Sequence, residues 1–208
     1  MGTQRMCMAI DQHIIKRPFF GFMIILILIS SEYNINIEKY LKYDTIEQVI
    51  TMDVFTDLVH TLMQKKYHIT SAESCTAGMF CSHLADVSGA SDVLAYGFVV
   101  YSAEAKCDML GVNPETIAAY GVVSEETARE MVSGAVCRSG AEIGVSFTGY
   151  AGPGVDPEIG KVCFGFLIPG RLTSKTVMFG NIGRNTVREK AAAFAAAELL
   201  KLLEAESC

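Results

Sequence analysis

The chain has 208 residues, of which 50% are hydrophobic and 19% are charged, and its formal net charge is −6. This composition is that of a folded globular protein and excludes an intrinsically disordered chain. The acidic balance, without a run of lysine or arginine, predicts that nucleic acid is not a partner, whereas a local positive pocket for a small anionic ligand stays compatible with it.

Residues 1–44 differ in character from the rest of the chain. The apolar run Phe19–Ile29 is shorter than the roughly 20 residues of a membrane-spanning helix, so we expect no membrane partner. Basic residues before an apolar run are also typical of a signal peptide, but no small-x-small cleavage site follows. We expect residues 1–44 to be a poorly ordered extension or a start-site artefact, with Met52 a sensible start. Export is the alternative interpretation.

The remainder, residues 45–208, is expected to fold as one domain. Apolar residues recur at three- and four-residue steps over Thr45–Lys66, which predicts an amphipathic helix. Further helices are predicted over residues 76–87, 103–110 and 114–120, then from the N-cap Ser124 to about residue 139, and from the N-cap Asn185 to about residue 204.

Strands are predicted over residues 67–71, 93–101, 142–148, 161–168 and 174–179, of which 93–101 is rich in Val, Phe and Tyr and is expected to be buried. Helices and strands alternate early in the domain, and a hairpin comes late. This pattern predicts an α/β fold, a layered α/β/α sandwich with a mixed β-sheet.

The seven cysteines are odd in number and widely spaced, and neither a CxxC nor an HxxxH pattern occurs. Free thiols in a reducing cytoplasm fit this distribution best. We therefore predict a cytoplasmic protein with no structural or catalytic metal.

The first unusual segment is Ser71–Gly78, at a predicted strand-to-helix turn. A hydroxyl at such a turn, here Ser74, can attack a carbonyl, and amides at the helix start can hold the oxyanion that forms. The plainer interpretation is that Ser74 or Thr76 merely caps the helix. Cys75 is a rival nucleophile without a histidine nearby in sequence.

The second segment is Tyr101–Lys106, where a strand runs into a helix. None of the four histidines lies in or beside the unusual segments, so a lysine with a lowered pKa is the candidate base for Ser74. Lys106 is the lysine in this segment and is therefore the candidate base. Tyr101 could relay a proton or hydrogen-bond the nucleophile. Taken alone, Lys106 would be interpreted as a solvated helix residue.

The third segment is the loop Gly149–Gly154. Its glycines allow close approach of a ligand, but their order is not that of a dinucleotide-binding fingerprint. The plainer interpretation is a simple turn. The more specific interpretation is one wall of an anion or ribose site, with Arg184 supplying charge to a phosphate and Arg188 close enough to compete.

Together these segments resemble the CinA carboxy-terminal domain family, which includes stand-alone nicotinamide-nucleotide amidases. The resemblance covers about residues 45–203. Its motifs are Ala72-Glu73-Ser74-Cys75-Thr76, Tyr101-Ser102 with Glu104-Ala105-Lys106, Gly121-Val122-Val123-Ser124-Glu125-Glu126, Thr148-Gly149 with Ala151-Gly152-Pro153, and Gly183-Arg184. Ala77 stands where the family usually has a second glycine.

The resemblance implies deamidation of nicotinamide mononucleotide to nicotinate mononucleotide and ammonia, with no cofactor. It implies that Ser74 is the nucleophile and that Lys106 and Tyr101 are catalytic. We expect the substrate to be bound by Thr76, Gly78, Thr148, Gly149, Gly152 and Arg184. The resemblance also implies that the protein forms a homodimer. The alternatives are a non-catalytic interaction module of the competence or damage response, and the same chemistry on another amide.

Overall fold

The computed structural model describes residues 43–154 and 158–205, with side chains from residue 54 onward. Most of the predicted extension, residues 1–42, lies outside the described residues. The molecule divides into two compact units, residues 1–49 and 50–208. Of the first unit, residues 43–49 are described and form the beginning of a helix. The sheet, the core and the candidate site all belong to the second unit.

The described residues form helices and strands that largely follow the predicted order. In chain order they are α2 (Tyr43–Lys65), β1 (Ile69–Glu73), α3 (Met79–Ala85), the 3-10 helix η2 (Ala90–Asp92), β2 (Leu94–Val99), α4 (Ala103–Leu110), α5 (Pro114–Tyr120), α6 (Glu125–Ser139), β3 (Ile143–Gly149), β4 (Lys161–Ile168), β5 (Arg171–Met178) and α7 (Arg184–Ala205).

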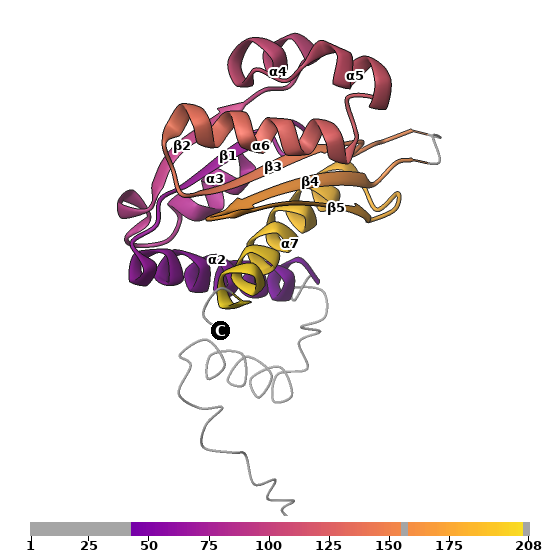
Figure 1. The fold of residues 1–208 in the computed structure, drawn as a ribbon. Coiled ribbons are helices and arrows are strands. Elements are labelled where there is room, and N and C mark those ends of the chain that lie inside the picture. Colours follow the sequence, from indigo (N-terminus) through magenta and orange to yellow (C-terminus); the bar gives the residue numbers. More distant parts are fainter. Residues whose placement is uncertain (1–42, 155–157, 206–208) are drawn as a thin grey trace, which may run out of the picture. The chain divides into compact units, whose positions relative to one another are not determined.

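The five strands form one mixed sheet in the order β2-β1-β3-β4-β5. Strand β1 is parallel to both β2 and β3, whereas β4 and β5 continue the sheet as antiparallel neighbours. Helices α4, α5 and α6 lie on one side of this sheet, and α2, α3 and α7 lie on the other (Figure 1). The predicted α/β/α sandwich with a mixed sheet is therefore confirmed.

Apolar residues on the two faces of the sheet form separate clusters. On the side of α2, α3 and α7, the alternate β3 residues Ile143, Val145 and Phe147 belong to the larger cluster. On the side of α4 and α6, a smaller cluster includes Ala72 and Met131. The alternation along β3 is the period of two that a strand between two helical layers requires.

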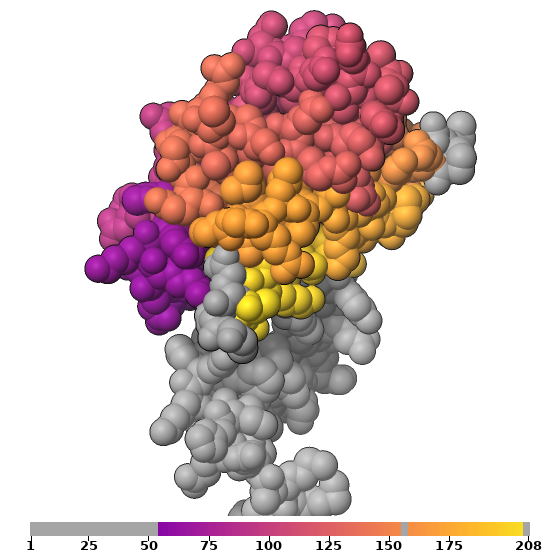
Figure 2. All heavy atoms as spheres, viewed as in Figure 1, coloured from indigo at the N-terminus to yellow at the C-terminus, as the bar shows by residue number. Residues whose placement is uncertain are grey.

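Helix α6 lies unusually close to the sheet, because small residues face it. A Cβ atom on Gly144 would come within 2.5 Å of Val136, and one on Gly165 would come within 2.4 Å of the Ala128 carbonyl. Ser146 makes use of this approach by donating a 2.6 Å hydrogen bond to the same carbonyl. In the space-filling view, α4, α5 and α6 form a continuous face beside β4 and β5 (Figure 2).

Several predicted boundaries shift. The first strand is Ile69–Glu73 rather than residues 67–71, the second hairpin strand begins at Arg171 rather than 174, and the last helix begins at Arg184, so Asn185 is inside it rather than capping it. The prediction of a buried strand over 93–101 was wrong. The strand is shorter, Leu94–Val99, and half-exposed because it is the sheet's edge strand. Its Val, Phe and Tyr content indicated a strand, not burial.

None of the helices in the described ranges is long and apolar enough to cross a membrane. The cysteines within those ranges are free thiols: Cys75, Cys81, Cys107, Cys137 and Cys163.

The turn between β1 and α3 contains an unfavourable residue. Ala77 is exposed and has a positive φ of 51°, a left-handed conformation that costs a residue with a Cβ roughly 1–2 kcal/mol. We predict that Ala77→Gly raises the free energy of unfolding by about 1 kcal/mol, since glycine's greater freedom in the unfolded chain offsets part of the gain. Urea unfolding measures the change.

Ala197→Gly, in the interior of α7, is the control for this prediction and should lower the free energy of unfolding by about 1 kcal/mol. A loss of stability from both substitutions would contradict the explanation from backbone conformation.

Candidate active site

Three predicted segments converge at the carboxyl ends of neighbouring strands of the sheet. Strand β1 lies between β2 and β3 and is parallel to both, so the carboxyl ends of all three strands meet there. The chain leaves β1 for β2 on one side and then crosses through α4–α6 to β3 on the other. Open α/β sheets bind ligands at such a reversal of strand order. Ser74 follows β1 directly, and Tyr101 follows β2.

Ser74 and Lys106 meet at these strand ends. Lys106 lies in the first turn of α4 and is fully buried, while Ser74 is 7% exposed. The Lys106 Nζ donates to Ser74 Oγ over 3.0 Å. The same amine donates to the Val100 carbonyl at 2.9 Å and to the Tyr101 carbonyl at 3.3 Å. The interpretation of Lys106 as a solvated helix residue is therefore wrong.

The surroundings of the Lys106 amine suit a base. Burial lowers the pKa of the amine, because the charged form loses its hydration. A neutral amine has two N–H donors and one lone pair. With the two donors on the carbonyls of Val100 and Tyr101, the lone pair is left for the Ser74 hydroxyl along the same 3.0 Å contact. This arrangement is that of a general base beside a nucleophile.

Tyr101 contributes through its backbone rather than through its ring. Its carbonyl accepts from Lys106 and lies 3.4 Å from Ser74 Oγ, where it is a second, more distant acceptor for the single hydroxyl proton. The side chain is 60% exposed, and within the described part of the chain its phenol has no hydrogen bond with Ser74 or Lys106. The geometry therefore does not support the predicted proton relay through the phenol.

The helix after the nucleophile begins later than predicted, at Met79 instead of residue 76. The amides of this helix start are already bound, because the Glu73 carboxylate accepts from the N–H groups of Gly78 at 2.8 Å, Phe80 at 3.2 Å and Cys81 at 3.1 Å. These helix-start amides are therefore not free for an oxyanion, and the expectation that amides beside Ser74 hold it stays a prediction for the rest of the turn. The N–H of Cys75, beside the nucleophile, has no acceptor on another described residue and is the better candidate.

Cys75 itself is a poor rival to Ser74. Burial raises the pKa of its thiol to about 12, so the reactive thiolate is almost absent at neutral pH.

A cavity of about 370 Å³ opens at these strand ends. Its lining includes most of the predicted site residues: Ser74, Tyr101, Thr148, Gly149, Gly152 and Arg184, together with Cys75, Val122, Val123, Tyr150, Ala151, Pro153, Gly154 and Ile159. Lys106 reaches the cavity through its contact with Ser74. Arg184 is exposed at the start of α7 and brings a positive charge to the wall.

Two predicted substrate-binding residues do not line this cavity. Gly78 donates its N–H to Glu73 and serves the turn through its positive φ of 91°. Thr76 is fully buried, and its hydroxyl is the one buried side-chain polar atom without a partner in the described ranges. Thr148 does line the cavity, but its hydroxyl donates to the Val122 carbonyl at 2.8 Å.

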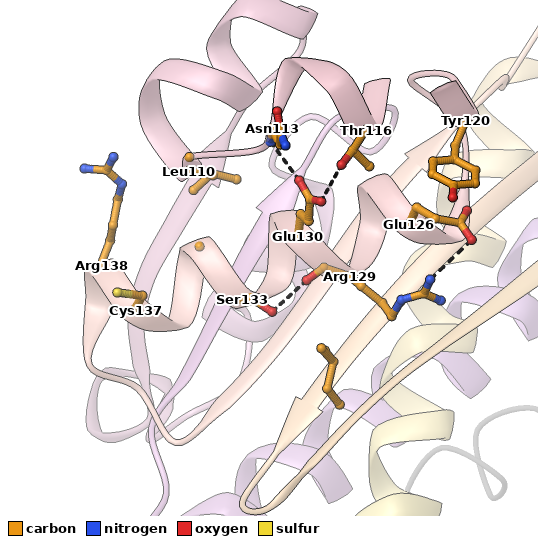
Figure 3. A pocket seen from close by; sticks show the side chains of 13 residues that line it. Leu110, Asn113, Thr116, Tyr120, Glu126, Arg129, Glu130, Ser133, Cys137 and Arg138 are labelled. Carbon is orange, nitrogen blue, oxygen red and sulfur yellow. Dashed lines mark hydrogen bonds and ion pairs between the residues drawn. The ribbon is translucent and has the colours of Figure 1, made fainter. Parts of the chain in front are cut away.

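A larger cavity, of about 840 Å³, lies away from these residues, between α5 and α6 (Figure 3). Glu130 points at Asn113 and Thr116 and accepts from both, and Arg129 pairs with Glu126 at 3.2 Å. These polar groups are bound to one another, and the cavity contains none of the predicted site residues. The smaller cavity is therefore the better candidate site.

Sequence reasoning missed the roles of Glu73 and Arg188 in holding the turn. Glu73 lies beyond the predicted strand of residues 67–71, so its place at the end of a fully buried strand was visible only in the structure. The hydrogen bonds of Arg188 to the turn, across more than a hundred residues, had no sequence signal. Within the described residues, no three His, Cys, Asp or Glu side chains gather in a way that could hold a metal ion.

Comparisons with known proteins agree on one family. A model of the CinA C-terminal domain matches residues 52–203. A CinA-like protein from Kosmotoga olearia is 43% identical over 141 residues, 66% of this chain and 34% of that protein. A CinA-like protein from Chlorobaculum tepidum is 41% identical over 158 residues, 72% of this chain and 36% of that protein. The chain thus spans about a third of the length of these relatives.

Solved structures match over most of their length. The competence or damage-inducible protein from Enterobacter asburiae is 35% identical, with a TM-score of 0.71 over 74% of this chain and 98% of that chain. The competence/damage inducible protein CihA from Agrobacterium tumefaciens is 33% identical, with a TM-score of 0.71 over 74% of this chain and 96% of that chain.

The lowered pKa of Lys106 leads to a test that needs no substrate. Between its folded and its ordinary pKa, the unfolded chain holds the proton that the folded protein lacks, so rising pH stabilises the folded state. We predict that the stability of the wild type relative to Lys106→Met rises as the pH increases towards 10.5, the ordinary pKa of a lysine, as measured by urea unfolding. Lys201→Met, at an exposed position, should show no such trend. A pH-independent difference for Lys106→Met would contradict the lowered pKa.

Proposed function

Because the chain belongs to the CinA C-terminal domain family, we propose that it is an amidase that converts nicotinamide mononucleotide to nicotinate mononucleotide and ammonia. The observation that carries this proposal is the buried 3.0 Å contact between Lys106 Nζ and Ser74 Oγ at the wall of a cavity. A serine and a buried lysine in contact form a known alternative to the serine–histidine pair in acyl transfer.

In the first half of the reaction, the neutral Lys106 amine accepts the hydroxyl proton of Ser74 while Oγ attacks the carboxamide carbon. The carbonyl oxygen becomes an oxyanion, and the N–H of Cys75, which has no acceptor on another described residue, donates to it. The C–N bond then breaks, and Lys106 returns the proton to the departing nitrogen, so that ammonia leaves and Ser74 carries an ester.

In the second half, water attacks the ester carbon and gives its proton to Lys106. The bond to Ser74 Oγ breaks, the proton passes from Lys106 back to Oγ, and the nicotinate product leaves. Each step uses the one lysine alternately as base and acid. Lys106 therefore needs a pKa lower than that of a solvated lysine, and its burial lowers the pKa in this way.

The remaining cavity features support a nucleotide substrate. The volume of the cavity, about 370 Å³, is within the roughly 300–1,000 Å³ typical of small-molecule sites. The glycines of the loop at 149–154 allow close backbone approach to a ribose. Arg184 is the arginine on the cavity wall, whereas the guanidinium of Arg188 is bound to the turn, so we assign the substrate phosphate to Arg184.

Ammonia release from nicotinamide mononucleotide tests the assignment of the nucleophile. We predict that Ser74→Ala lowers kcat at least about 10³-fold while still binding the nucleotide, because the covalent route is lost. Cys75→Ala is the matched control and should retain most of the activity. The reverse result, with Cys75→Ala inactive and Ser74→Ala active, would transfer the role to the thiol.

If the wild type releases no ammonia from this nucleotide or from related amides, the chain is an interaction module and the amidase proposal is wrong. If ammonia is released only from a different amide, the proposed Ser–Lys chemistry is supported and the proposed substrate is wrong.

The phosphate assignment has its own test. We predict that Arg184→Ala raises KM for nicotinamide mononucleotide about tenfold or more, since a charge-assisted contact is lost, and leaves KM for the riboside within about twofold. Steady-state kinetics on both substrates measures the split. Equal effects on nucleotide and riboside would remove Arg184 from the phosphate site.

A further inference from the structure

The turn that presents Ser74 is held by opposite charges at its two ends. At the helix end, Glu73 accepts the N–H groups of Gly78, Phe80 and Cys81. At the other end, the Arg188 guanidinium donates through Nε to the Cys75 carbonyl at 3.1 Å and through Nη2 to the Thr76 carbonyl at 2.8 Å. The carboxylate thus binds donors of the turn, and the guanidinium binds acceptors.

The hydrogen bonds of Arg188 are transmitted to Ser74 through the peptide planes. In a trans peptide the C=O and the following N–H point in opposite directions, so fixing one fixes the other. Holding the Thr76 carbonyl therefore orients the N–H of Ala77, which donates to the Ser74 carbonyl at 3.1 Å. Arg188 is in this way connected to the backbone of the nucleophile by two successive hydrogen bonds.

The turn needs such support, because its conformation is unfavourable by itself. Ala77 has a φ of 51° and Gly78 a φ of 91°, and the first of these is costly for a residue with a Cβ. The part of α7 that carries Arg188 is itself packed into the core. Next to Arg188, Val187 is fully buried in the larger core cluster, as is Ala191 one turn further along α7.

Arginine suits this position better than lysine. Its planar guanidinium presents several N–H donors in fixed directions, whereas the ammonium of lysine is a single flexible point charge. Besides the two carbonyls, Nη1 of Arg188 donates to Asn185 Oδ1 at 3.3 Å, which fixes the plane of the group.

From these contacts we propose that Arg188 is a positioning residue for the reaction, and that it aligns Ser74 with Lys106 by holding the carbonyls of Cys75 and Thr76. This role rests on the proposed function only in that Ser74 is the nucleophile. It differs from the role of Arg184, which lies one helical turn earlier and lines the cavity. The first turns of α7 then carry both the arginine that binds the substrate phosphate and the arginine that positions the nucleophile.

The kinetic test compares Arg188→Ala, Arg188→Lys and the control Lys201→Gln, a side chain of the same helix that is 72% exposed. We expect Arg188→Ala to lower kcat on nicotinamide mononucleotide about 10²-fold, because a small misplacement of the nucleophile is enough, and to leave KM within about twofold. Arg188→Lys should recover little of the loss, and Lys201→Gln should match the wild type. Added guanidinium at millimolar concentration should partly restore Arg188→Ala, whereas equal sodium should not.

Three kinetic results would overturn the proposal. They are wild-type kcat in Arg188→Ala, full activity in Arg188→Lys, which would reduce the role to charge, and a rise in KM at constant kcat, which would make Arg188 a substrate-binding residue.

Hydrogen–deuterium exchange separates failure of this proposal from failure of the proposed function. We expect faster exchange of the amides of residues 74–78 in Arg188→Lys than in the wild type or in Lys201→Gln, whether or not ammonia is released. Arg188→Lys is chosen because it keeps the charge and most of the aliphatic stem, so the fold is retained. Unchanged exchange over this turn would overturn the proposal even in an active enzyme. Faster exchange in a protein that releases no ammonia would support the part of the proposal in which Arg188 holds the turn, and would count against the proposed function alone.

Discussion

The arrangement of the site depends on one buried hydrogen bond, that between the Lys106 amine and the Ser74 hydroxyl. A lysine amine removed from water is tolerated only where polar atoms surround it, and here the carbonyls at the end of β2 provide them. Strand β2 ends at Val99. The Val100 N–H still donates to the Glu73 carbonyl at 2.9 Å, but the carbonyls of Val100 and Tyr101 accept from the Lys106 amine. The end of an edge strand thus determines where the base can sit.

The pKa of Lys106 depends first on its burial and then on the charge state of its neighbour Cys75. A thiolate there would favour the ammonium form of the lysine and raise its pKa. Burial instead raises the pKa of the Cys75 thiol to about 12, so this anion does not form near neutral pH. Burial thus lowers the pKa of the amine and raises the pKa of the thiol, so it favours the uncharged form of both groups.

The sequence predicted the layered fold from hydrophobic periodicity. It proposed Lys106 as the partner of Ser74 because no histidine lies in or beside the unusual segments and because the ordered motifs resemble a known family. It could not predict that β2 is an edge strand, since Val, Phe and Tyr favour a strand whether or not a neighbour covers it. It also placed the helix start at residue 76, where Ala77 gives no sign of its positive φ. Long-range contacts such as that of Arg188 with the turn appear only in the folded chain.

The late start of α3 changes how the site handles negative charge. If the helix began at Thr76, its free amides would face the nucleophile and could bind an oxyanion. With the start at Met79, the free amides belong to Glu73, whose carboxylate would repel a second anion close by. If Ser74 is the nucleophile, we therefore expect the oxyanion near the N–H of Cys75 rather than near the start of α3. The charge of Arg188 polarises the two peptides whose carbonyls it binds, and their N–H groups belong to Thr76 and Ala77. Because the N–H of Ala77 donates to the Ser74 carbonyl, this polarisation passes on to the peptide that carries the N–H of Cys75 and makes that N–H a better donor.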